Sequence, residues 1–163
     1  MKFFLTIGVS CIVTLMVIPG LAQEKAPPTA GQVAAGTWAW GEDLSYVRNH
    51  FVKAAEEFPE DKYGYRPTEE TRTFAEIIMH VARYNHLSAA HAMGRQSEDV
   101  HEFAFNSKAE AVAKLKKSFE QLEEVAKLKG DQFPLDVLIH TSEHYGNLVV
   151  YYRLNGLVPP ASR

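Results

Sequence analysis

Apolar residues recur every three or four positions in four separate segments of this chain, and no segment alternates apolar and polar residues as a β-strand does. This spacing predicts four helices. We expect them to span residues 40–58, 73–93, 107–130 and 133–155. Four amphipathic helices without strands predict an all-α fold, and we expect a single four-helix bundle over residues 38–160.

The expected helices also carry local start and stop signals. The segments TFAE (73–76) and SKAE (107–110) have the spacing of a capping box, in which the first and fourth residues satisfy each other's backbone N–H groups. Gly130 is suited to ending the third helix, and Pro134 is suited to the first turn of the fourth.

The first 22 residues have the pattern of a secretory signal peptide rather than of a folded element. A short positive start is followed by an apolar run over residues 3–18 and by small residues up to Ala22. We expect cleavage near Ala22 and export, to the periplasm or outside the cell, with no membrane span left after cleavage. An uncleaved anchor is the alternative. Residues 23–37 are small, polar and proline-containing, so we expect a short disordered leader.

Composition excludes several classes of function. The only cysteine, Cys11, lies in the expected signal peptide, so the mature chain has no disulfide, no cysteine nucleophile and no thiolate metal ligand. The formal net charge is −3 and no basic stripe is present, which argues against a nucleic-acid partner.

Two histidines in the fourth segment are the strongest functional signal. His140 and His144 lie one helical turn apart, on the stripe that also carries Val137, Leu148 and Tyr151. Unsatisfied polar groups in a core cost about 1–3 kcal/mol, so two core-facing imidazoles need partners. One divalent metal ion satisfies both; hydrogen bonds to backbone or side chains are the alternative.

A third ligand has to come from upstream, and His80 is the best candidate because it lies midway along the second helix, beside its apolar arc. His91 is eleven residues further on, about 16 Å along a helix, and cannot bind the same ion. His86 is expected on the polar surface. His50 and His101 have no feature that favours a functional role.

Two other metal chemistries fit poorly. HTSEH (140–144) spells the H-x-x-E-H motif of inverted zinc peptidases, but no acidic residue follows Glu143 to supply their further ligand. A ferritin-like di-iron site needs inward Glu-x-x-His motifs on two helices, and the only one here, Glu98–His101, falls in a loop.

Two stretches resemble the DinB-like superfamily of metal-binding four-helix bundles. They are FPEDKYGYRPTEETRTFAEIIMHVARYNH (58–86) and HTSEHYGNLVVYYRLNGLVPP (140–160). The resemblance implies one divalent ion, usually zinc or nickel, on His80, His140 and His144. It also implies thiol-dependent transferase, isomerase or hydrolase chemistry. The chain has Asn147 where the family often has glutamine, three residues after the last histidine.

Three functional hypotheses follow. The first is a metal-dependent hydrolase or thiol transferase of the cell envelope, acting on an unknown small-molecule substrate, since three imidazoles leave an ion with open positions. The second is a non-catalytic metal- or ligand-binding bundle, and the third a structural dimer with core histidines. No catalytic residue is identified; the side chains expected around the ligands are Glu76, Tyr84, Glu143 and Asn147.

The fourth helix is apolar on nearly all sides, which bears on assembly. Leu138, Tyr145, Val149 and Tyr152 face broadly away from the stripe of the two histidines. A bundle helix normally needs one apolar face, so a homodimer through this second face is expected, with a fully buried central helix as the alternative.

Overall fold

Four α-helices make up most of the computed structural model, which describes residues 40–95 and 104–163. They are α1 (Trp40–Glu57), α2 (Phe74–Ala92), α3 (Lys108–Lys129) and α4 (Leu135–Leu154), with single turns of 3-10 helix at η1 (Glu60–Lys62), η3 (Gly130–Gln132) and η4 (Pro160–Ser162). The described residues contain no strand, so the all-α prediction is confirmed for them. The expected signal peptide, the leader and His101 lie outside the described residues.

The helix starts agree with the local signals, with one difference. Thr73 caps α2 through a complete capping box with Glu76. Ser107 caps α3 by accepting the backbone N–H of Glu110, but the Glu110 carboxylate accepts the N–H of Asn106 instead of completing a box. The Glu110 side chain therefore accepts the backbone N–H of the residue before the N-cap.

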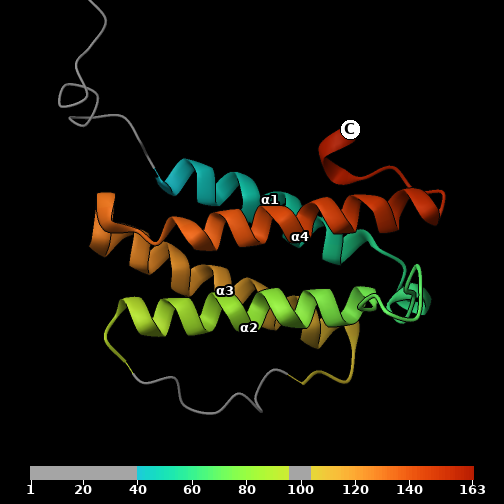
Figure 1. The fold of residues 1–163 in the computed structure, drawn as a ribbon, viewed down its shortest axis with the longest axis horizontal. Coiled ribbons are helices and arrows are strands. Elements are labelled where there is room, and N and C mark those ends of the chain that lie inside the picture. Colours follow the sequence, from blue (N-terminus) through green and yellow to red (C-terminus); the bar gives the residue numbers. More distant parts are fainter. Residues whose placement is uncertain (1–39, 96–103) are drawn as a thin grey trace, which may run out of the picture. The chain divides into compact units, whose positions relative to one another are not determined.

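The helices form a ring in which each packs mainly against two neighbours. The contacting pairs are α1 with α3, α1 with α4, α2 with α3, and α2 with α4. In Figure 1, α1 and α4 run in one direction while α2 and α3 run in the other. Because α2 and α4 are antiparallel neighbours, residues near the middle of one lie opposite the middle of the other.

Aromatic side chains fill the end of the bundle where α2 begins. The rings of Phe58 and Phe74 stack with centroids 3.8 Å apart, and Tyr152 packs against Phe58 at 5.1 Å. The Tyr152 hydroxyl donates to the Ala54 carbonyl at 2.7 Å. The Tyr151 hydroxyl donates to the carbonyl of Arg72, just before α2. These bonds attach α4 both to α1 and to the start of α2.

Both predicted apolar faces of α4 are covered within the chain, which changes the argument for a dimer. Tyr152 is only 2% exposed, and the half-buried Tyr145 hydroxyl accepts the backbone N–H of Ala161 in the C-terminal tail. α1 and the C-terminal tail thus cover much of this face within one chain, as in the alternative of a buried helix, and the homodimer stays a prediction. Apolar side chains of α4 that are exposed, such as Ile139 at 54% and Val150 at 50%, lie on a third side.

None of the described helices is both long enough and apolar enough to cross a membrane.

Candidate metal centre

His80, His140 and His144 come together where the middle of α2 faces α4. Each imidazole offers one ring nitrogen such that these atoms all lie within 4.8 Å of one another. The Nε2 atoms of His80 and His140 are 3.0 Å apart, and the centroids of the three rings lie 4.6–4.9 Å from each other. The nitrogens of two ligands bound at about 2.0–2.1 Å to a tetrahedral zinc ion are separated by a little over 3 Å. The spacing of His80 and His140 therefore fits one shared ion, and the His144 ring adjoins both of them.

The surroundings keep these imidazoles neutral, which is the form that binds metal. Burial lowers the pKa of His140 to about 4, helped by the neighbouring His80 and by Arg72. Burial likewise lowers the pKa of His144 to about 4, with further contributions from His140 and His80. The pKa of His80 is also lowered, first by burial and then by Arg72 and Arg83. At neutral pH all three present lone pairs.

The protein does not satisfy the polar atoms of His140 by itself. Its Nδ1 is buried and has no hydrogen-bond partner among the described residues, and its Nε2 lies 3.0 Å from the Nε2 of His80. Buried polar groups without partners are rare, and one explanation of them is a missing water or ion. The donor set fits a divalent cation bound between the two Nε2 atoms, whereas Nδ1 lies at the other edge of the His140 ring and needs a separate partner.

Tyr84 and Asp136 hold His140 from the side. The Tyr84 ring stacks on the His140 ring, with centroids 3.7 Å apart and planes 21° from parallel. Its hydroxyl donates to Asp136 Oδ2 at 2.8 Å, and this bond raises the pKa of Tyr84. No role was predicted for Asp136 from the sequence. A signal was present, because Asp136, His140 and His144 are each four residues apart and therefore lie on one stripe of the helix.

The other residues expected around the ligands have different surroundings. Asn147 places its amide nitrogen 3.5 Å from His144 Nδ1, so its side chain can orient that ring. The Glu76 carboxylate accepts the Thr73 N–H at 2.6 Å and pairs with Arg66 at 3.6 Å. Glu143 is exposed. Glu76 is thus engaged at the start of α2 and is not free to act as a base.

The remaining described histidines lie apart from this cluster. His86 is half-buried, so it is less exposed than expected, and its Nδ1 lies 2.9 Å from Oε1 of Gln121 on α3. His91 is exposed near the end of α2, and His50 contacts the backbone carbonyl of Tyr46 through Nδ1 at 2.8 Å.

A buried polar contact sets the register of the helices next to the cluster. Asn85 is fully buried; its amide donates to Ser118 Oγ and its carbonyl accepts from Thr141 Oγ1, each at 3.4 Å. Because Thr141 follows His140 and Asn85 follows Tyr84, this contact fixes α4 against α2 where the stacked rings meet. Nothing in the spacing of apolar residues indicated it.

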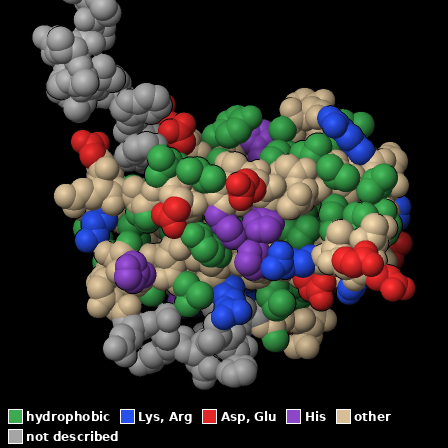
Figure 2. All heavy atoms as spheres, in the orientation of Figure 1, with side chains coloured by type: hydrophobic (Ala, Val, Ile, Leu, Met, Phe, Trp, Pro, Cys, Tyr) green, Lys and Arg blue, Asp and Glu red, His purple; other side chains and the backbone are tan. Residues whose placement is uncertain are grey.

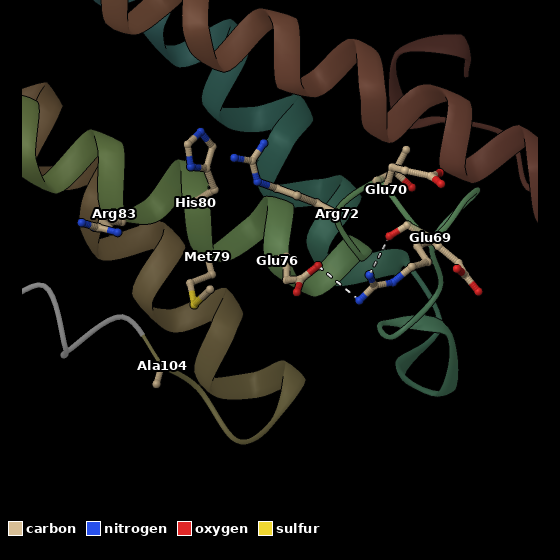
Figure 3. Close-up of a pocket in the computed structure, with 10 residues that line it drawn as sticks. Glu69, Glu70, Arg72, Glu76, Met79, His80, Arg83 and Ala104 are labelled. Atoms are coloured by element: carbon tan, nitrogen blue, oxygen red, sulfur yellow. Dashed lines mark hydrogen bonds and ion pairs between the residues drawn. The ribbon is translucent and has the colours of Figure 1, made fainter.

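The cluster is open to solvent along a groove. Figure 2 shows histidine side chains gathered on the surface of this face, with basic side chains beside them. A cavity of about 620 Å³ lies along the start of α2 and reaches His80; its walls include Arg66, Arg72 and Arg83 (Figure 3). A second cavity of about 600 Å³ lies on the other side of Tyr84 and Asp136. A small molecule therefore has room to approach the cluster from the side of His80.

Comparison with protein families identifies the superfamily of this chain. The family model of the DinB superfamily matches residues 43–148, which include all three histidines. Comparison with curated proteins and with solved structures gave no match.

Proposed function

This chain belongs to the DinB superfamily, and we propose that it holds one divalent metal ion, zinc or nickel, on His80, His140 and His144. The observation that carries the proposal is the convergence of three neutral imidazoles from α2 and α4 at the edge of an open groove. We further propose that it is a metal-dependent hydrolase or thiol transferase of the cell envelope.

The arrangement supports catalysis because a substrate can reach the proposed metal ion. A divalent ion with three imidazole ligands supplies a Lewis acid with open positions, which can activate a water molecule or a substrate thiol. The groove beside His80 lets a substrate reach those positions. Tyr84, stacked on His140 and bonded to Asp136, holds one ligand in orientation, and Asn147 does the same for His144.

The metal site is tested by loading and by substitution. We expect purified protein loaded with zinc to contain one equivalent after gel filtration, measured by plasma mass spectrometry. The His144→Ala variant should lose it, whereas the control His91→Ala should keep it, because His91 is exposed and outside the cluster. Full stoichiometric zinc in the His144→Ala protein would show that this site is wrong.

A non-catalytic metal-binding bundle is the second candidate, and one observation favours it. The acidic residues nearest the ligands in sequence are poorly placed as bases, because Glu76 is engaged in the helix cap and Glu143 is exposed. The two candidates are separated by assaying metal-loaded protein on a panel of esters, amides and thiol acceptors. Turnover that stops on chelation and is absent in His144→Ala supports the enzyme; no turnover with stoichiometric metal supports the binding protein.

A further inference from the structure

Arg72 stands out among the charged residues of the groove because the fold holds its backbone in place. It directly precedes Thr73, the N-cap of α2, and its carbonyl accepts a hydrogen bond from the hydroxyl of Tyr151 on α4. Tyr151 is only 5% exposed. The Arg72 side chain is exposed, and in Figure 3 its guanidinium group points toward His80. A buried anchor thus presents an accessible cation beside the cluster of histidines.

The arginines that line this groove differ in whether their charge is offset. Arg66 pairs with Glu76 at 3.6 Å and donates to the Glu69 carbonyl at 3.3 Å. Within residues 40–95 and 104–163, Arg72 has no carboxylate at ion-pair distance. The carboxylates of Glu69 and Glu70 lie toward the far end of the groove from His80 in Figure 3. Arg72 therefore adds a positive charge without an ion-pair partner beside His80, while Asp136 and Glu143 are the carboxylates that act on His140 and His144.

A metal ion on the three histidines makes this end of the groove more positive still. Like charges close together repel, and an anion bound between them offsets that repulsion. A guanidinium group matches the two oxygens of a carboxylate or another oxyanion through paired N–H donors, which a single ammonium cannot do. The ligand that suits both centres has an electron-rich donor atom at one end and an oxyanion at the other.

We propose that Arg72 binds the oxyanion group of a small-molecule substrate whose other end reaches the metal, so that the site selects anionic substrates over neutral ones. This inference rests on the proposed metal site and adds a substrate class to it. Arg72 is a binding residue in this scheme, and no bond is made or broken at it.

The test uses cobalt-loaded protein and thiols of matched length. Thiolate binding is followed by the sulfur-to-cobalt charge-transfer absorption, a readout that does not depend on activity. The probes are 3-mercaptopropionate, 2-mercaptoethanesulfonate and neutral 2-mercaptoethanol, with mercaptoacetate, 4-mercaptobutyrate and 6-mercaptohexanoate to vary the reach. Comparing each probe between wild type and variant cancels differences in thiol acidity.

The variant is Arg72→Met, and the matched control is Arg66→Met, which removes the same charge from the same groove where it is already paired. At least one anionic thiol should bind the wild type more tightly than 2-mercaptoethanol, and Arg72→Met should reduce that preference about fivefold, as expected for a partly exposed charged pair. Affinity for 2-mercaptoethanol and the preferences of Arg66→Met should stay unchanged. Carboxylate and sulfonate probes distinguish a planar from a tetrahedral oxyanion.

Two failures are distinguishable. The inference is wrong and the metal site stands if cobalt binds stoichiometrically but Arg72→Met keeps the wild-type preference for anionic thiols over 2-mercaptoethanol. The same holds if Arg66→Met loses as much of this preference as Arg72→Met does. If cobalt does not bind, or binds equally to His144→Ala, the proposed metal site is wrong and this inference falls with it.

Discussion

The capping box at the start of α2 offers a quantitative test of how the sequence builds the site. The Thr73 side chain accepts the Glu76 N–H at 3.1 Å, and the Glu76 carboxylate accepts the Thr73 N–H at 2.6 Å. Arg72 lies immediately before this cap, and His80 lies about two turns after it. The substitution Thr73→Ala removes the first bond and leaves an N–H at the helix start without its partner.

The expected cost follows from these contacts. Replacing an N-cap threonine by alanine costs about 1 kcal/mol of unfolding free energy. With a urea dependence of about 1.5 kcal/mol per molar, the midpoint of metal-free protein should fall by about 0.7 M. The control Thr73→Ser keeps the hydroxyl and should change the midpoint much less. Because the two bonds form one unit, Thr73→Ala and Glu76→Ala should couple by about 0.5 kcal/mol or more in a double-mutant cycle.

The cap also predicts a pH dependence with a definite sign. The hydrogen bond from the Thr73 backbone N–H is the main reason why the pKa of Glu76 lies below its ordinary value of 4.5. A carboxyl whose pKa is lower in the folded state stabilises the fold above the unfolded pKa and loses that contribution as pH falls through the folded pKa. The destabilisation caused by Glu76→Ala should therefore be present at pH 6 and shrink toward pH 3.

Urea titrations followed by circular dichroism, with chelator present, measure all of these quantities. Equal stabilities for Thr73→Ala and Thr73→Ser would refute the assignment of the cap, and strict additivity of the Thr73 and Glu76 substitutions would refute their reciprocal bonding.

Three further predictions concern the site and the N-terminus. Metal-free protein should lose stability as pH falls from 7 to about 4, because the pKa values of His140 and His144 are lowered to about 4 and the unfolded chain takes up protons at higher pH. In urea titrations, replacing both His140 and His144 by glutamine should make the free energy of unfolding depend less on pH over this range. An equal pH dependence in the variant would contradict the assignment of these pKa values. Tyr84→Leu should weaken metal binding about tenfold in chelator competition, as expected for a residue that orients a ligand. Tyr84→Phe, which keeps the stacked ring, should lose less; equal affinity in all three proteins would remove Tyr84 from the site. Mass spectrometry of the exported protein should find Gln23 as the first residue, and an intact segment 1–22 would overturn the predicted cleavage.

The sequence alone determined the features that depend on local geometry. A helix bonds residues four apart, so the spacing of apolar residues located all four helices to within one or two residues. The same period placed His140 and His144 on one face, and the Thr73–Glu76 spacing indicated the cap. The motif likeness pointed to the family that the match over residues 43–148 shows.

Only the tertiary structure decided which faces meet. The adjacency of α2 and α4 brings His80 within reach of His140, and it pairs Tyr84 with Asp136, 52 residues away in the chain. The same packing covers much of the second apolar face of α4, including Tyr152, and the Arg72 guanidinium lies toward His80 (Figure 3). The period of residues along a helix is set by hydrogen bonds within that segment, so a local pattern can reveal it. The contacts between α2 and α4 depend on how the faces of separate helices pack together, which no local pattern encodes.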